Sequence, residues 1–572
     1  MELRSYQRWI AQHDSWSAGE EVAWRRRVRQ LRRQPVISVL LPVYNPDLGF
    51  LEAAINSVRE QVYENWQLCI ADDASTDASV RPLLEAMSRS DLRVRVVFRP
   101  QNGHIAACTN SALGLATGDW CALLDQDDVL RPHSLAAVAC EIERHPDAGV
   151  FYSDEDKIDA QGHRSDAYFK SDWNPQLFFG HNMVSHLGVY RSTLLREIGG
   201  FREGFEGSQD YDLVLRCSER LRADQIRHIP HVLYHWRTAP GSVAGDSKAK
   251  PYANIAARKA IADHLSRRGI AGRVEPCPEE ATTHRVIFEI PDPPPLVSIV
   301  IPTRDRVALL RRCIESIREK TDYGTYEFVI VDNGSIEHET HAYLGSIADE
   351  FGARVVRDNG AFNFSRLINR GVAESRGSVL ALLNNDTEVE NRDWLREMVS
   401  RALLPETGAV GARLWLPDGT IQHAGVVVGL GGVAAHAMFG FPRRHPGYFS
   451  NLFLARNCTA VTAACMVLRK ETFEQVGGFD EVNLPVNFND VDFCLRLRAL
   501  GLQIVWTPYA NLIHHESASR GQHGSAEEQA RFFRESRFML ERWSPELRAD
   551  PFYNPNLTLD YPGFDLAFPP RL

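Results

Sequence analysis

Val36-Ile-Ser-Val-Leu-Leu-Pro-Val-Tyr-Asn45 begins with an apolar run that a proline closes, and the same pattern returns as Val297-Ser-Ile-Val-Ile-Pro-Thr-Arg-Asp305. Each run is typical of a central strand of a parallel sheet, buried on both faces. Two further blocks recur in step, because the block at Asp72 returns 260 positions later and the block at Asp127 returns 259 positions later. Spacing that holds across separate blocks indicates the duplication of a whole domain.

Strands and helices alternate within each copy. In the first copy we expect helices at 51–62 and 106–116 between strands at 36–41, 66–71, 94–98 and 120–124. This order predicts an α/β fold with a doubly wound, mostly parallel sheet, whose ligands bind beyond the carboxyl ends of the strands. No G-x-G-x-x-G motif follows the first strand, which argues against a dinucleotide site.

Composition and linker residues divide the chain into five segments. The proline-rich stretch Pro291-Asp-Pro-Pro-Pro295 lies between the copies and marks a boundary. We expect a basic helical extension, the first domain, a linker, the second domain and a C-terminal extension at 1–34, 35–270, 271–295, 296–525 and 526–572.

Charge and cysteine content limit the classes of partner. A net charge of -10 argues against general nucleic-acid binding. The ten cysteines include no C-x-x-C pair, which fits reduced thiols in a cytoplasmic protein. No apolar stretch resembles a signal peptide or a membrane span.

Residues 1–34 differ in kind, with eight arginines against four carboxylates and several tryptophans. Trp24, Val28 and Leu31 share one helical face. One interpretation is a helix that packs on the first domain. The other is a peripheral contact with the anionic inner face of the cell membrane.

Six motifs in order in each copy resemble inverting family 2 glycosyltransferases of the GT-A fold. In the first copy they are Leu-Pro-Val-Tyr-Asn45, Asp-Asp-Ala-Ser-Thr-Asp77, Leu-Asp-Gln-Asp-Asp128, Gly-Gly-Phe201, Gly-Ser-Gln-Asp-Tyr-Asp212 and Leu-Tyr-His-Trp-Arg237. The tandem pair resembles bacterial enzymes that build O-antigen, capsule or related surface polysaccharides. The resemblance implies two GT-A domains, nucleotide-sugar donors and a glycan acceptor that is lipid-linked.

The resemblance also implies a divalent cation, Mg²⁺ or Mn²⁺. A departing diphosphate develops negative charge, which such an ion neutralises when carboxylate oxygens hold it. By resemblance Asp125 and Asp127 are metal ligands of the first copy, with His235 as the third. In the second copy the corresponding ligands are Asp386 and His514.

Donor contacts follow from the same motifs. The second copy reads Asn384-Asn-Asp386 where the first reads Asp125-Gln-Asp127, a variant that resembles the rhamnosyltransferase branch of the family. An arginine near the end of that copy would pair with the donor phosphates. The donor-binding residues implied are Pro42, Tyr44, Asp72, Asp125, Pro302, Arg304, Asp332, Asn384 and Arg520.

An inverting displacement needs a base for the acceptor hydroxyl. Asp210 and Asp490, 280 positions apart at predicted helix starts, resemble the catalytic position of the family, although aspartate at a helix start can also be an N-cap. The function expected is therefore a bifunctional glycosyltransferase. Two alternatives stay open: a second domain that is a pseudo-enzyme binding the acceptor, and a nucleotidyltransferase.

Overall fold

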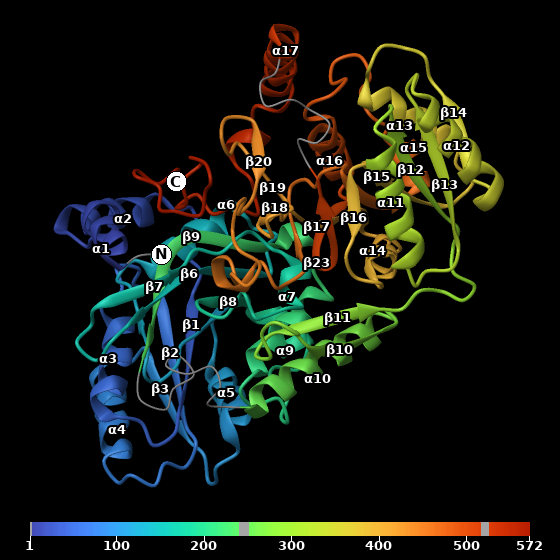
Figure 1. Cartoon of the computed structure of the whole chain (residues 1–572). Helices are drawn as coiled ribbons and strands as arrows, with labels where there is room; N and C mark the ends of the chain where they lie inside the picture. Colours follow the sequence, from blue (N-terminus) through green and yellow to red (C-terminus); the bar gives the residue numbers. More distant parts are fainter. Residues whose placement is uncertain (1–2, 239–250, 516–524) are drawn as a thin grey trace.

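The computed structural model describes residues 3–238, 251–515 and 525–572. Two large sheets, one in each copy, form its framework (Figure 1). The first sheet has the order β3-β2-β1-β4-β8-β6-β9-β5, with β7 beside β6. Its strands are β1 Ile37–Val43, β2 Trp66–Asp72, β3 Val94–Phe98, β4 Trp120–Leu123, β5 Val129–Leu130, β6 Val150–Ile158, β7 Arg164–Tyr168, β8 Gly188–Arg191 and β9 Ile226–Arg237.

The second sheet repeats this order as β14-β13-β12-β15-β22-β17-β23-β16. Parallel and antiparallel pairs also correspond, since β1 pairs in parallel with β2 and β4, and β12 does so with β13 and β15. The two copies recognised in the sequence therefore have the same sheet topology. Its strands are β12 Val297–Thr303, β13 Tyr326–Asp332, β14 Arg354–Arg357, β15 Val379–Leu383, β16 Thr387–Val389, β17 Thr407–Trp415, β22 Cys465–Arg469 and β23 Gln503–His514.

Smaller strands complete the second copy and the linker. β18 Ile421–His423 and β21 Arg456–Asn457 extend the second sheet, and β19 Val426–Val428 pairs with β20 Ala434–His436. Between the copies, β10 Gly272–Pro276 and β11 His284–Phe288 form an antiparallel hairpin.

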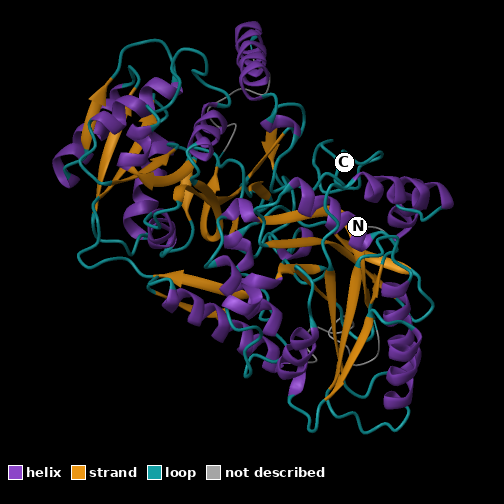
Figure 2. Cartoon of the chain, turned by 180° about the vertical axis from the view of Figure 1, so that it is seen from behind, coloured by secondary structure: helices purple, strands orange, loops and turns teal. Residues whose placement is uncertain are grey.

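Helices cover both faces of each sheet (Figure 2). Successive strand residues therefore enter different cores: Val39 and Leu40 belong to separate clusters, as do Ile299 and Val300. The helices of the first copy are α3 Leu48–Arg59, α4 Val80–Ser90, α5 His104–Leu115, α6 Ser134–Arg144, α7 Pro175–Phe178, α8 Ser192–Glu197, α9 Gln209–Ser218 and α10 Pro251–Arg267. Those of the second are α11 Val307–Glu319, α12 His338–Phe351, α13 Phe364–Ala373, α14 Trp394–Ala402, α15 Lys470–Gln475, α16 Asn489–Ala499 and α17 Ala526–Trp543.

The same close approach recurs at one glycine of each copy. A Cβ on Gly118 would lie 2.5 Å from the carbonyl oxygen of Val36, and a Cβ on Gly377 would lie 2.6 Å from that of Leu296. Only glycine lets the segment before β4 or β15 pass so near the neighbouring strand. These glycines set the start of the strand that leads into the acidic motif.

The C-terminal residues tie the two copies together. Asn554 donates through Nδ2 to both carboxylate oxygens of Asp154 on β6, each at 3.0 Å. Asp550 accepts from the Val428 amide at 2.9 Å and from the Thr459 hydroxyl at 2.6 Å in the second copy. The tail therefore adds hydrogen bonds to a contact between the copies that also includes apolar side chains of both, such as Phe169 and Val427.

The N-terminal extension packs on the first copy as two helices, α1 Leu3–His13 and α2 Ala18–Gln30. Trp9 is buried, and the Tyr6 hydroxyl donates to Asp156 at 2.6 Å. Trp16 and Trp24 stack on His133, with ring centroids 5.3 and 5.0 Å away. The aromatic side chains face the protein, so the first interpretation of this segment describes their packing. Among the described residues, no helix has both the length and the apolar character needed to cross a bilayer.

Candidate active site

A cavity of about 1000 Å³ opens at the carboxyl ends of the central strands of the first sheet. Parallel strands direct their ends, and the loops that follow them, to this edge. Five residues expected from the sequence line it: Pro42, Tyr44, Asp125, Asp127 and Asp210. The cavity therefore collects residues from β1, from the loop after β4 and from the start of α9.

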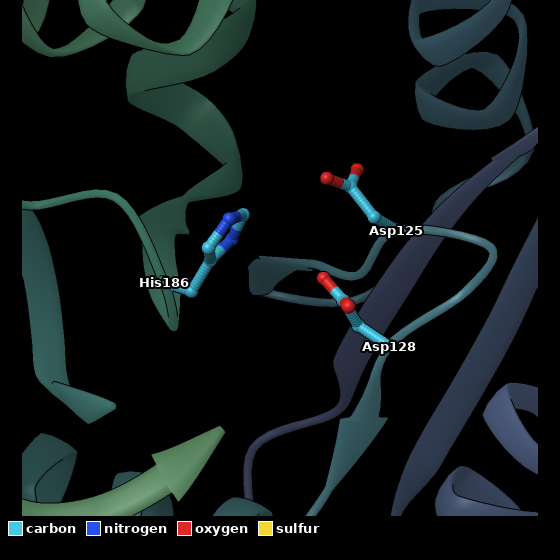
Figure 3. Close-up of side chains that lie close together, drawn as sticks. All are labelled: Asp125, Asp128 and His186. Atoms are coloured by element: carbon cyan, nitrogen blue, oxygen red, sulfur yellow. The ribbon is translucent and has the colours of Figure 1, made fainter. Parts of the chain in front are cut away.

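Asp125, Asp128 and His186 form a cluster in this region, with ligand atoms within 4.8 Å of one another. Figure 3 shows the two carboxylates, from the loop after β4, turned toward the imidazole from across the site. Two carboxylates and an imidazole are a donor set that suits Mn²⁺ and similar ions. These residues thus fit a divalent cation.

Asp128 is completely buried and anchors the acidic loop. It accepts hydrogen bonds from the Tyr234 hydroxyl at 2.6 Å and from the Arg237 amide at 2.7 Å. The Tyr234 oxygen in turn accepts from the Asp125 amide at 3.2 Å. Burial, together with the charges of Asp125 and Asp127, raises the pKa of Asp128 well above its usual range. A bound cation would relieve this repulsion.

A buried ion pair fixes the backbone of His186. Lys170 donates through Nζ to Glu155 at 2.9 Å and to the His186 carbonyl oxygen at 2.6 Å. The same Glu155 oxygen accepts from the His186 amide at 3.0 Å. The imidazole itself stacks on Tyr234, with ring centroids 4.4 Å apart. Backbone and ring of His186 are therefore both fixed toward the acidic loop.

His235, the expected third ligand, is not part of the cluster that contains Asp125. The His235 Nδ1 is hydrogen-bonded to Asp156, a carboxylate that also accepts from Tyr6. Neighbouring residues of a strand point to opposite faces, and the next residue, Trp236, lines the cavity. His235 therefore faces away from the site.

Asp210 lies in the first turn of α9 and accepts a hydrogen bond from the Asn182 amide at 2.7 Å. Burial raises the pKa of Asp210, and the neighbouring His186 offsets only part of that effect. Asp212, two residues later, has a different role, because it is fully buried and pairs with Arg216 at 2.8 Å. Of the two carboxylates, Asp210 is the one that lines the cavity.

Asp72 ends β2 but does not line the cavity, whereas its neighbour Asp73 does. Asp72 accepts from the Ser75 amide at 3.4 Å, and Asp73 pairs with the Arg99 guanidinium at 2.6 Å. The second copy differs here, because the equivalent Asp332 itself pairs with an arginine, Arg357, at 2.6 Å.

The second copy brings together three of its expected residues. His514 Nε2 lies 3.0 Å from an Asp386 oxygen and 3.3 Å from the Asn384 amide nitrogen. Burial alone would raise the pKa of Asp386, but the hydrogen bond and charge of His514 outweigh it and lower that pKa. Asn384, Asp386 and His514 therefore form a compact group at the end of β15.

Strand register shows that His514 and His235 are not equivalent. Val129 pairs with His235 in the first copy, and the corresponding Glu388 pairs with Ile513 in the second. His514 thus corresponds to Trp236, on the face that lines the first cavity.

The remaining expected residues of the second copy are spread around the same strand ends. Pro302 is buried in β12, and Arg304, just beyond it, is exposed. Asp490 opens α16 and accepts from the Ala463 amide at 3.1 Å. Arg520 lies outside the described residues.

Comparison with known proteins decides the family. Residues 38–199 and 298–477 match the model for Glycosyl transferase family 2. The chain belongs to this family. Each match covers most of the strands of one of the two sheets, so the protein contains two tandem α/β family 2 domains of the GT-A type.

Two relatives match nearly the whole chain. The chain is 51% identical to the uncharacterized protein y4gI of Sinorhizobium fredii over 95% of its length, covering 60% of that protein. It is 38% identical to the O-antigen biosynthesis protein RfbC of Myxococcus xanthus over 96% of its length, covering 43% of that protein. The chain thus spans about half the length of these relatives.

Among solved structures, the chain is similar to the mannosyltransferase PcManGT of Pyrobaculum calidifontis in complex with GDP-Man and Mn²⁺. The match covers 45% of this chain and 65% of the mannosyltransferase chain. The TM-score is 0.32 and the sequence identity is 16%.

The sequence did not identify Asp128 or His186 as site residues. Asp128 was visible in the family 2 motif, but its burial and its bond to Tyr234 come only from the fold. His186 reaches the site from the loop before β8, and strand pairing places Ala464 at the corresponding position of the second copy. The duplication therefore gave no signal for this histidine.

Proposed function

We propose that the protein is a bifunctional inverting glycosyltransferase, in which each family 2 domain transfers one sugar from a nucleotide-sugar donor to a growing bacterial surface polysaccharide. The observation that carries the proposal is the recurrence of one arrangement: an aspartate in the first turn of α9 and of α16, and an acidic group at the end of β4 and of β15. Displacement needs both features, a base and a site for the diphosphate.

Asp210 is the proposed base of the first domain. Its raised pKa makes the carboxylate a stronger proton acceptor than an ordinary aspartate. The carboxylate would take the proton of the acceptor hydroxyl while Asn182 holds one of its oxygens in place. Asp490 would take the same role in the second domain.

Asp125, Asp128 and His186 are the proposed holders of a divalent cation, with Asp127 on the same cavity wall. When bound, such an ion neutralises the charge that develops on the diphosphate. The side chains set its place: Tyr234 fixes the acidic loop, and the ion pair behind His186 fixes the imidazole.

The second domain keeps one carboxylate, Asp386, with His514 and Asn384. We propose that it binds a metal more weakly than the first domain but remains a transferase. The alternative, a pseudo-enzyme domain that binds acceptor glycan, would retain no need for Asp490 as a base. The nucleotidyltransferase alternative conflicts with the family 2 match.

We further propose that the acceptor is lipid-linked and that the protein works in the cytoplasm, at the inner face of the cell membrane. Support comes from exposed arginines of the N-terminal extension, including Arg26, Arg29 and Arg33. Each basic residue near an anionic surface contributes about 1 kcal/mol. Because the tryptophans pack inward, this contact would be electrostatic.

The proposal is tested by transfer assays with a panel of UDP-, GDP- and dTDP-sugars, using the full chain and two variants, Asp127→Ala and Asp386→Ala. We expect each variant to lose transfer from one donor and to keep transfer from the other, or to lose one of two additions if both use the same sugar. If both variants behave as the unchanged chain does, the strand-end carboxylates have no part in transfer.

A further inference from the structure

An aromatic side chain stands beside the proposed base of the first domain. Tyr252, in the first turn of α10, lines the cavity and is 52% exposed. Its ring covers Gly207, where an added Cβ would lie 2.9 Å from Tyr252 Cε2. The adjoining Ser208 hydroxyl donates to the Ala253 carbonyl oxygen at 2.8 Å. The start of α10 is therefore fixed over the segment that leads into Asp210.

The second domain repeats this arrangement with a different aromatic residue. Phe532 on α17 is 45% exposed and lies against Phe488, with ring centroids 5.5 Å apart. Phe488 directly precedes α16, which carries Asp490 in its first turn. Phe532 follows Tyr252 by 280 positions, the offset that also separates Asp490 from Asp210.

The helix that carries Phe532 is attached to the same segment by a buried carboxylate. Glu535, 1% exposed, accepts from the Asn487 amide and from its Nδ2, both at 2.6 Å. Asn487 lies immediately before Phe488. Although α17 projects from the body of the molecule (Figure 1), its middle is therefore held next to the proposed base.

We propose that Tyr252 and Phe532 are acceptor-binding residues, each stacking its ring on a sugar of the acceptor glycan next to the base of its domain. This inference rests on the proposed function. A pyranose ring presents a face of C–H groups that packs on an aromatic face, while its hydroxyls stay in water. Half-exposed rings at the edge of a site suit this contact, since they cover one face of a ligand only.

The position favours the acceptor over the donor nucleobase, which could also stack on a ring. The base must reach the acceptor hydroxyl, so the surface beside Asp210 belongs to the acceptor. The expected donor residues Pro42 and Tyr44 come instead from the end of β1. In the second domain Phe533, 69% exposed with its ring 6.2 Å from that of Phe532, would extend the platform to a second sugar.

The test compares Tyr252→Ala and Phe532→Ala with two matched controls on the same helices, Ile255→Ala and Leu540→Ala, whose side chains are also exposed. The probe is an array of bacterial surface polysaccharide fragments, and the fragment that the unchanged chain binds then serves as acceptor. We expect each aromatic variant to weaken fragment binding and raise the acceptor KM of one addition roughly tenfold. The donor KM and the melting temperature should stay unchanged.

Tyr252→Phe and Phe532→Tyr retain a ring and should restore binding. A higher donor KM with an unchanged acceptor KM would assign the rings to the nucleobase and overturn the inference. So would equal effects of the controls, or no fragment bound by the unchanged chain. Donor-dependent transfer by Asp127→Ala and Asp386→Ala tests the proposed function separately. A failure of the proposed function can therefore be distinguished from a failure of the acceptor-binding inference.

Discussion

Lys170 and Glu155 form a buried ion pair next to the backbone of His186, with 2.9 Å between Nζ and Oε2. Both partners bond the backbone of that histidine, one at its carbonyl oxygen and the other at its amide. In the second domain strand pairing places Leu414 at the position of Glu155 and Ala464 at the position of His186. The ion pair and the histidine are thus features of the first domain.

Lys170→Met removes one partner and leaves Glu155 buried without its cation. We expect the free energy of unfolding of the first domain to fall by about 3–5 kcal/mol, and its Mn²⁺ affinity to fall because His186 is no longer fixed. Urea unfolding and Mn²⁺ titration measure the two effects.

The double variant Lys170→Met with Glu155→Leu separates the effect on stability from the effect on Mn²⁺ affinity. Replacing both charges with apolar groups restores most of the stability, but it does not restore the hydrogen bonds to the His186 backbone. The matched control is Lys157→Met, which breaks the more exposed pair with Asp166 and should cost less than about 1 kcal/mol. Unchanged Mn²⁺ affinity in the double variant would contradict the positioning role.

The acid limit of the first transfer should lie above the usual aspartate range, because the pKa of Asp210 is raised by burial. A base works only when ionised, so the rate should rise with pH through that pKa. The pH–rate profile of the first addition measures it, and a profile that stays flat down to the usual aspartate range would exclude Asp210 as the base.

The same raised pKa predicts an effect on stability with a definite sign. Folding favours the protonated carboxyl, so its contribution is complete below the unfolded-state pKa and is lost as pH rises through the folded-state pKa. Asp210→Asn stays neutral at all pH values, and we therefore expect it to unfold at higher temperature than the unchanged chain at neutral pH.

Asn384→Asp should strengthen metal binding in the second domain. The change places a second carboxylate beside Asp386 and His514, where an amide nitrogen now lies 3.3 Å from the imidazole, and carboxylate oxygens are preferred ligands of Mg²⁺ and Mn²⁺. Mn²⁺ titration in an Asp125→Asn background isolates the second site. The reverse change, Asp125→Asn alone, should weaken the first.

If the N-terminal extension contacts the membrane, replacing three exposed arginines with glutamate should lower binding to phosphatidylserine vesicles. The three residues are Arg26, Arg29 and Arg33. The physical reason is the loss of attraction to the anionic surface, about 1 kcal/mol for each basic residue. Flotation at low and physiological salt measures it. Equal flotation of both proteins would rule the contact out.

The strand ends and their carboxylates could be predicted from the sequence. The residues of β1, β2 and β4 are apolar runs of strand length, and a polar motif follows each run directly. Parallel topology then brings those motifs to one edge. Asp125 and Asp127 line the cavity at this edge, whereas Asp210, at the start of α9, was expected from the family resemblance. These features depend on local pattern plus one rule of topology.

The third residue of the proposed metal site depended on information that local pattern does not contain. His235 and Trp236 differ by one position, and only the pairing of Val129 with His235 decides which of them faces the site. His186 arrives through the antiparallel pairing of β8 with β4, a contact between distant segments. Register and long-range pairing, more than residue type, therefore define this part of the site.

The central claim is that two separable transferases act in sequence, each with its own base. Asp210→Asn and Asp490→Asn keep the shape of the side chain but remove its capacity to accept a proton, so each should slow one addition by roughly 10²–10⁴-fold. Donor binding should survive in both variants.

The most direct measurement is the length of product that each variant makes from a defined acceptor, alone and mixed, resolved by mass spectrometry. One variant should add no sugar, the other should accumulate a product one sugar short, and the mixture should restore elongation because the intermediate passes between molecules. If Asp490→Asn instead gives product of the same length at the same rate as the unchanged chain, the second domain is not a transferase and the account is contradicted.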